Sequence, residues 1–425
     1  MPALKKVRDI VLWSIIFLLP TQIGYHFWPD FSFVAGFRID YLSPTLYLTD
    51  ILIFTYILQK FFLGWQKILV QFIRSRIFWQ NNLLIFTVFI LVIIFASINS
   101  TLTLFSWGKI IFYLLFFIFL RQEKNLIRKI QSPLILSTIL IIGLEIAQLI
   151  KQQSLNGIFY WLGERNFNLS TPNIAKLNIQ GTQLLRPYST FSHPNSFAGF
   201  LLLIYILFKP KYQRGKFFKI FFQNIIILGI LITFSKAAAL ALLAILIYQK
   251  LEFKLKTLYF KIILITSLTI SLLPLFANYI SLSFNPSSTI LSRLYLGPPT
   301  LAIIKQNLIM GVGLNNFIPA LAGQLSPSHI FAHTLQPIHS IPLLAISELG
   351  LIGIVLIVWF TKKYLLKGLT LKGRLYDKGS DLIVLLIILA ITSSVDHYWW
   401  TLHQNHLILI LVLAILFQKN TNREI

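Results

Sequence analysis

The sequence contains no cysteine and few charged residues, which make up only 12% of its 425 positions. Without cysteine the protein forms no disulfide, uses no thiol nucleophile and offers no thiolate ligand to a metal. Soluble domains carry about 25% charged residues. Acidic residues are the scarcest, with 13 Asp and Glu against 37 Lys and Arg. This shortage of charge argues against a soluble globular protein.

Apolar residues take the place of charge, at 56% of the chain and a mean hydropathy of +0.76. The runs at 83–98 and 201–208 are continuous, whereas a membrane β-barrel would show alternation. One crossing takes roughly 20 apolar residues, so we predict an all-α polytopic membrane protein of about 12 transmembrane helices. The predicted helices lie at 10–28, 45–63, 83–99, 103–120, 133–150, 195–208, 219–234, 237–250, 261–280, 341–360, 381–396 and 404–418. They form one integral membrane domain over 1–425.

The basic residues predict how the chain is oriented. A net charge of +24 is compatible with nucleic-acid binding, but these residues are scattered between apolar runs instead of forming one patch. Of the 37 Lys and Arg, 28 fall on the side of the N-terminus, which predicts that both termini are cytoplasmic. The apolar run after Arg8 lacks a signal-peptide cleavage site, so we interpret it as the first transmembrane helix. We therefore expect a multi-pass protein of a bacterial inner membrane.

Two long connections are expected on the extracytoplasmic side, at 151–194 and at 281–340 before the third-last helix. All eight histidines fall on that side in this topology. Histidine titrates near neutral pH and suits proton transfer. Polar aromatic residues also favour the membrane interface, which is the alternative explanation.

The first long connection ends in a segment with features of an anion site. Arg186 precedes His193-Pro194-Asn195, and an apolar helix is predicted to follow. Asn195 is a suitable N-cap. An outward-facing helix N-terminus next to an arginine favours an anion. A plain loop with a capped helix is the alternative.

Two further cations lie in apolar surroundings. Lys236 follows Ser235 between two closely linked helices, and it faces either an anion or, by snorkelling, the interface. Arg293 lies in an expected interfacial helix over 291–305. Gly311 and Gly313 follow, but they lack the ending of a phosphate loop, so a turn is the better interpretation.

The second connection ends at His339, next to a helix whose cap is expected at Ser340 or Ile341. The positive end of a helix dipole favours a neutral imidazole, which a general base requires. Glu348 lies two turns into this helix, and an intramembrane carboxylate is a functional candidate. With arginines for a diphosphate, this set suggests transfer from a phosphate leaving group to a hydroxyl. A metal is not expected, because His-Glu-x-x-His is absent and acids are few.

These motifs together resemble the O-antigen ligase/polymerase family of bacterial membrane glycosyltransferases. The segments Arg186–Asn195, Thr233–Ala239, Ser292–Phe317 and His339–Gly353 follow the family's motif order, and the resemblance covers roughly 180–360. Lys236 stands where the family usually has arginine, which removes the bidentate fork.

The resemblance implies that an undecaprenyl-diphosphate-linked glycan is the donor at the outer leaflet. By this resemblance Arg186, Arg293 and Lys236 would hold the diphosphate and His339 would act as base without metal or cofactor. His193, Asn195 and Glu348 would have supporting roles. The acceptor hydroxyl would belong to lipid A core, another glycan chain or a protein, in cell-surface polysaccharide biosynthesis. Expected partners are therefore this donor, the acceptor and the lipid bilayer, and not nucleic acid.

Two other functions fit parts of the sequence. Some relatives of the family have been proposed as transporters of inorganic carbon, so a transporter of a small solute such as bicarbonate is the main alternative. A transporter would show paired breaks in corresponding halves, which the sequence lacks. A non-catalytic scaffold fits any polytopic chain, but it explains neither the histidines nor the ordered motifs.

Overall fold

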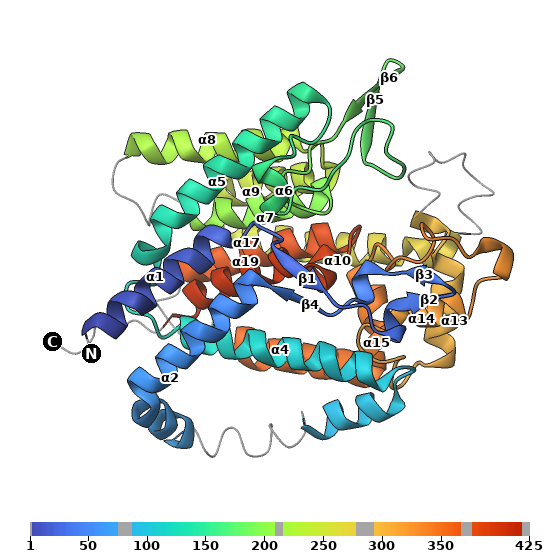
Figure 1. Ribbon diagram of the computed structural model, residues 1–425, viewed down its shortest axis with the longest axis horizontal. Coiled ribbons are helices and arrows are strands. Elements are labelled where there is room, and N and C mark those ends of the chain that lie inside the picture. The colour runs from blue at the N-terminus through green and yellow to red at the C-terminus, as the bar shows by residue number, and fades with distance from the viewer. Residues whose placement is uncertain (1, 75–86, 209–215, 278–292, 367–375, 419–425) are drawn as a thin grey trace.

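The structure is a computed structural model that describes residues 2–74, 87–208, 216–277, 293–366 and 376–418. Within these ranges the chain is mostly helical (Figure 1). The longer helices are α1 (Pro2–Leu18), α2 (Leu48–Arg74), α4 (Ser100–Leu120), α5 (Leu126–Lys151), α7 (Pro194–Leu207), α8 (Lys216–Ile232), α9 (Lys236–Lys250), α10 (Phe253–Leu272), α13 (Gly297–Gln306), α15 (Ile341–Phe360), α17 (Tyr376–Ser393) and α19 (His403–Leu416). The short helices are α6 (Ile158–Trp161), α14 (Phe317–Ala322) and α18 (Tyr398–Thr401).

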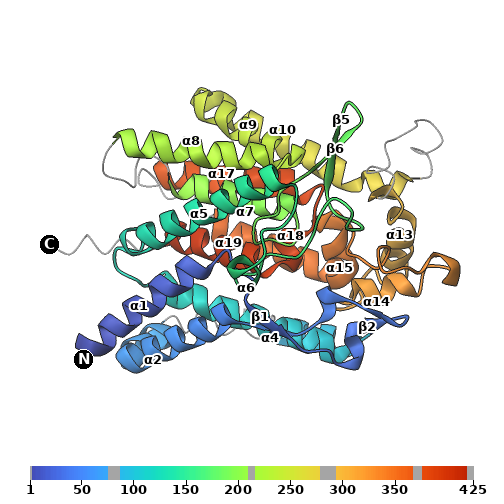
Figure 2. The same cartoon turned by 45° about the horizontal axis from the view of Figure 1, so that its top comes forward.

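The strands are short and form antiparallel pairs. β1 (Gly24–His26) pairs with β4 (Thr45–Tyr47), β2 (Phe33–Val34) with β3 (Phe37–Arg38), and β5 (Lys176–Ile179) with β6 (Thr182–Leu185). The β5–β6 hairpin, α13 and α14 all come from the two long connections. Figures 1 and 2 show them at the end of the molecule opposite the start of α1.

Helix α7 forms the centre of the largest apolar core. All of its residues are buried, which is expected of a helix that is apolar on every side. It packs against α8, α9, α17 and α19. The outer helices instead expose apolar faces: on α10, for example, Leu258 and Ile265 are 56% and 66% exposed. A continuous apolar exterior of this kind is typical of a surface that faces lipid.

Four helices of the described chain are long and apolar enough to cross a membrane: Ser100–Leu120, Leu126–Lys151, Lys254–Phe276 and Ile341–Lys363. Five shorter apolar helices accompany them, including Thr87–Ala96 and His403–Leu416. A helix occupies part of every segment predicted to span, although residues 83–86 and 278–280 lie outside the described chain. The prediction of a mostly helical protein with several candidate membrane spans is therefore confirmed, while the number and direction of the crossings stay predictions.

The structure corrects two details of the sequence prediction. The first helix ends at Leu18 instead of residue 28, because Pro20 follows and the chain then enters β1. Asn195 is not the N-cap of α7. That position belongs to His193, whose Nδ1 accepts the backbone N–H of Asn195 at 3.1 Å, with Pro194 in the first turn. The expected cap of α15 at Ser340 is confirmed.

The glycine pair of the second connection packs against a break in α15. Backbone hydrogen bonds join Val312 N–H to Ser347 O at 2.9 Å and Gly313 N–H to Glu348 O at 3.0 Å. Gly350 has φ 62° and ψ −174°, a combination essentially restricted to glycine. Gly311, Gly313 and Gly350 therefore belong to one structural unit that fixes the loop on helix α15.

We predict that Gly350→Ala strongly destabilises the protein. A Cβ there would lie 2.2 Å from Ile309 O, so the variant should lose roughly 2–4 kcal/mol through clash and backbone strain. Thermal unfolding of the purified protein in detergent measures the loss. Gly143→Ala in α5 is the matched control, because its added Cβ meets no atom within 4 Å. Equal melting temperatures for the two variants would contradict this account of the loop.

Candidate active site

The centre of the candidate site is the carboxylate of Asp396, in the link between α17 and α18. Asp396 is buried, and its Oδ1 accepts the backbone N–H of His397 at 2.8 Å. The same oxygen lies 3.9 Å from Nδ1 of His339. The other oxygen, Oδ2, accepts a hydrogen bond of 2.8 Å from Nδ2 of Asn195. Segments that lie far apart in the chain therefore meet at one acid.

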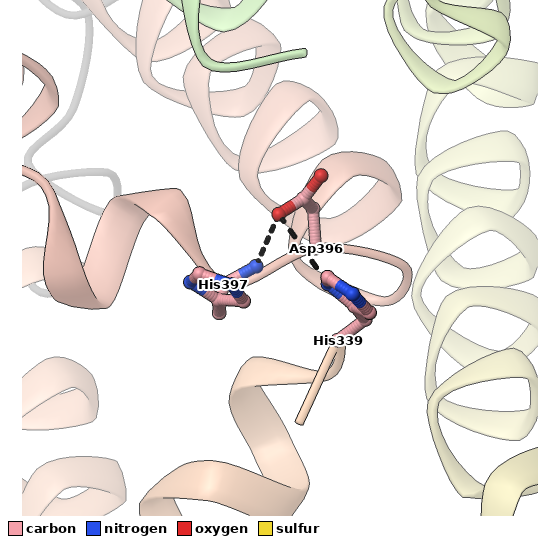
Figure 3. A group of neighbouring side chains, drawn as sticks. All are labelled: His339, Asp396 and His397. Atoms are coloured by element: carbon pink, nitrogen blue, oxygen red, sulfur yellow. Dashed lines mark hydrogen bonds and ion pairs between the residues drawn. The ribbon is translucent and has the colours of Figure 1, made fainter. Parts of the chain in front are cut away.

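His339 is located at the N-terminal mouth of α15, as the sequence predicts. Its ring stacks on His397, with centroids 5.2 Å apart and planes 19° apart, and Figure 3 shows the two imidazoles beside Asp396. The side chain is 21% exposed, but Nδ1 is buried and has no hydrogen-bond partner in the described chain. Nδ1 thus faces the acid, which leaves Nε2 as the ring nitrogen available to a substrate.

Arg186 joins the site through Asn195. Its Nη2 donates to Asn195 Oδ1 at 2.7 Å, and its Nε donates to the carbonyl of Thr233 at 3.0 Å. One arginine therefore connects the end of the first long connection to the turn between α8 and α9. We call Asp396, His397, His339, Asn195 and Arg186 the Asp396 cluster.

Two more of the predicted residues lie close to this cluster. Burial is the main reason that the pKa values of His193 and His339 are low, and the positive charge of Arg293 lowers them further, so Arg293 is within electrostatic reach of both. His193 caps α7 and its ring lies edge-on to that of Tyr188, with centroids 6.0 Å apart. Contacts and charge thus place five predicted residues near one another: Arg186, His193, Asn195, Arg293 and His339. Their roles toward a substrate stay predictions.

Lys236 and Glu348 are placed differently. Lys236 is the first residue of α9 and is exposed. No hydrogen bond or ion pair joins it to the Asp396 cluster in the part of the chain that the structure describes. Glu348 is buried, and its Oε2 accepts the indole N–H of Trp400 at 2.8 Å. Backbone N–H groups of Asn315 and Phe317 also donate to Glu348, so this acid holds the loop in place.

Asp396 and His397 were not among the site residues predicted from the sequence. Residues 381–396 were predicted as helix, whereas α17 ends at Ser393 and the next residues form a tight link. The available signal was an Asp-His pair between two apolar segments of a chain with only 13 acids. That signal does not reveal which residues from elsewhere the pair would contact.

Burial sets the protonation of the Asp396 cluster and of the nearby His193. It lowers the pKa of His193 to about 4, although Asp396 acts in the opposite direction. Burial also lowers the pKa of His339 well below its usual value, with the charge of Arg293 adding to the effect. For Asp396, burial alone would raise the pKa, but His397, His339, His193 and Arg293 together hold it below its ordinary range. The site therefore holds a carboxylate beside neutral imidazoles at neutral pH.

This arrangement suits proton transfer and anion binding. A neutral imidazole oriented by a carboxylate can accept a proton from a hydroxyl. Arginines at the same site can bind a phosphate through parallel N–H groups. His339, Asp396 and His397 also offer ligand atoms within 4.8 Å of one another, so the donor set itself is compatible with a metal ion. Three ligands of this kind occur in catalytic zinc sites.

Comparison with known families identifies what part of the chain is similar to. Residues 221–358 match the family described as O-Antigen ligase. This segment is an O-antigen ligase domain. The ligase domain contains Lys236, Arg293, His339 and Glu348, and it confirms the family resemblance over that range. Arg186, Asn195 and Asp396 lie outside it but contact the site it contributes to. No curated protein matches the chain.

We predict that Asn195→Ala destabilises the site next to the ligase domain. The variant removes the group that joins Arg186 to Asp396, so the half-buried arginine and the buried carboxylate each lose a hydrogen bond. The expected loss is about 1–3 kcal/mol, measured by thermal unfolding in detergent. Gln183→Ala, at an exposed position of β6, serves as the control. If both variants have the same melting temperature, the hydrogen-bonded bridge through Asn195 does not stabilise the site.

Proposed function

We propose that this protein transfers a glycan from undecaprenyl diphosphate to an acceptor hydroxyl at the outer face of a bacterial inner membrane. The acceptor is lipid A core, another glycan chain or a protein. The observation that carries the proposal is the position of His339, 3.9 Å from the buried carboxylate of Asp396, with Arg186 joined to the same acid through Asn195. Arg293 acts on this acid electrostatically, and both His339 and Arg293 lie inside the O-antigen ligase domain. The candidate spans and the apolar exterior support a membrane location.

In this mechanism His339 is the general base. The hydroxyl oxygen of the acceptor attacks the anomeric carbon, and its proton passes to Nε2 of His339. The bond from the anomeric carbon to the phosphate oxygen breaks, and undecaprenyl diphosphate leaves with the electron pair. Asp396 faces Nδ1 and stabilises the imidazolium that forms. The proton is then released to water.

Arg186 and Arg293 are proposed to hold the diphosphate. Charge grows on the leaving phosphate as its bond breaks, and a fixed guanidinium stabilises that charge. Arg186 already has Nε and Nη2 engaged by Thr233 and Asn195, so its orientation is set before the donor binds. Lys236 has only a peripheral role in this proposal, because it is exposed at the start of α9. No metal takes part.

We predict that His339→Ala and Arg293→Ala each abolish most transfer without unfolding the protein. Loss of a general base costs about 10²–10⁴-fold in rate, and loss of a charge-stabilising donor costs about 10²–10³-fold. Purified protein would be supplied with the host's lipid-linked glycan, and product followed on gels. Lys305→Ala is the control, because Lys305 is exposed in the same connection.

Full activity of both variants would refute the proposed mechanism. Adding EDTA to the wild type tests the metal-independent part, with no loss of activity expected. Inhibition by EDTA that zinc or magnesium reverses would assign His339, Asp396 and His397 to a metal instead.

We further predict an unusual pH profile. Since burial lowers the pKa of His339 well below 6.5, the base is already neutral at mildly acidic pH. The rate with saturating donor should therefore stay level from about pH 6 to 8, whereas a solvent-exposed histidine of pKa about 6.5 would lose half its activity near that pH. Initial rates across this range provide the test. A half-maximal rate near pH 6.5 would contradict the buried, neutral base.

A further inference from the structure

Arg165 is a cation of the first long connection that the proposed mechanism does not use. It lies between α6 and β5, and it is exposed. Its Nη1 donates to the carbonyl of Ser192 at 3.2 Å, directly before His193, which caps α7. Arg165 lies outside the O-antigen ligase domain and outside the ordered motifs of the sequence.

Two tyrosines place the Arg165 guanidinium at the edge of the candidate site. The ring of Tyr188 lies 6.0 Å from that of His193, and the ring of Tyr41 lies 5.5 Å from that of His397, measured between centroids. Burial is the main influence on the pKa of each tyrosine and raises it, and the charge of Arg165 acts on both in the opposite direction. A guanidinium within electrostatic reach of both rings lies near both histidines.

Electrostatic interactions connect Arg165, Arg186 and Arg293 in a series. Burial raises the pKa of Tyr188, and the charges of Arg165 and Arg186 both act to lower it. Burial lowers the pKa of Arg186, and the like charge of Arg293 lowers it further. Cations held near one another repel, so an anion that binds to them relieves this repulsion.

The acid next to Arg165 in the sequence is engaged elsewhere. Glu164 is buried, and its Oε1 accepts hydrogen bonds from Nε2 of Gln148 and from the backbone N–H of Leu155, both at 2.8 Å. Its Oε2 accepts the backbone N–H of Asn156 at 2.7 Å. No ion pair joins Arg165 to an acid among the residues that the structure describes. Its charge and its remaining N–H groups are therefore available to a ligand.

Charge balance at the site calls for one more cation when a diphosphate binds. The Asp396 cluster holds one carboxylate, one guanidinium and neutral imidazoles, and Arg293 adds a second positive charge. A diphosphate that is esterified at both ends carries one negative charge on each phosphate. Asp396, Arg186 and Arg293 together offset only one of these two charges.

The segment before Arg165 is suited to the lipid from which the donor comes. Helix α6 exposes Ile158, Tyr160 and Trp161, which are 71%, 56% and 74% accessible. Exposed tyrosine and tryptophan are typical of the interface between membrane and water. A donor whose lipid chain lies in the membrane therefore reaches the site past α6, on the side of Arg165.

We propose that Arg165 is a substrate-binding residue that holds the lipid-side phosphate of the donor. Arg186 and Arg293 face the phosphate next to the sugar, because that phosphate leaves beside His339. Arg165 binds the other phosphate through its remaining N–H groups and balances its charge. This assignment rests on the proposed glycan transfer and specifies how the diphosphate is divided among the arginines.

The first test separates the affinity for the donor from the rate at saturating donor. Arg165→Ala should raise the donor KM about tenfold and leave kcat within about twofold, because the lipid-side phosphate gains little charge as the sugar–phosphate bond breaks. Arg165→Lys keeps the charge and should recover most of the affinity. Lys176→Ala, at an exposed position of β5 in the same connection, is the matched control and should match wild type. A lower kcat at unchanged KM would overturn the assignment.

The second test measures binding without turnover. Farnesyl diphosphate and farnesyl monophosphate are titrated by calorimetry into the full-length protein in detergent. Arg165→Ala should weaken the diphosphate about tenfold and leave the monophosphate unchanged, because Arg186 and Arg293 suffice for a single phosphate group. Lys176→Ala should bind both probes like wild type.

Three results of the binding test would overturn the proposal. They are absence of diphosphate binding to wild type, unchanged diphosphate binding to Arg165→Ala, and equal weakening of both probes. Equal weakening together with a lower melting temperature of the ligand-free variant would assign Arg165 a structural role instead. Because no glycan is transferred, this test is independent of the His339→Ala transfer assay that decides the proposed function.

Discussion

The buried charge of Asp396 is the constraint on which the candidate site depends. A carboxylate removed from water must be compensated by donors and positive charge. Here the donors come from the α17–α18 link itself and from Asn195 at the start of α7, and His339 at the start of α15 faces the same oxygen. The starts of two helices and the end of a third are therefore held together by one acid. Arg186, tied to Asn195, is fixed by the same requirement.

A second buried acid, Glu348, fixes the relative positions of these segments. Glu348 accepts hydrogen bonds from the indole of Trp400 in α18 and from backbone N–H groups of the loop before α14. It thereby links the segment carrying Asp396 to the helix that begins beside His339. The glycines of the loop and of α15 allow the close backbone contact that this link requires. Glu348 thus holds elements of the site together.

The candidate site was partly predictable, because several of its residues lie at helix starts marked by polar and proline signals. His339 before Ser340 and the His193-Pro194-Asn195 segment are of this kind, and the structure brings both to Asp396. Asp396 itself was missed, because its importance comes from a contact with a residue 201 positions away. A single sequence contains no information on such pairings. For the same reason Lys236, whose charge matched the motif, was expected nearer the site than its exposed position allows.

Hydrophobicity along the chain by itself determined that this protein is helical and suited to a membrane, since a long apolar helix satisfies its own backbone hydrogen bonds wherever it lies. The order of its motifs indicated the O-antigen ligase resemblance, which the family match confirms over residues 221–358. Only the tertiary structure decided which polar groups share a site. It brought Asn195 and His339 to Asp396 and placed Glu348 against Trp400. Packing assigns these roles, because the free energy of a buried charge depends on neighbours that are distant in the sequence.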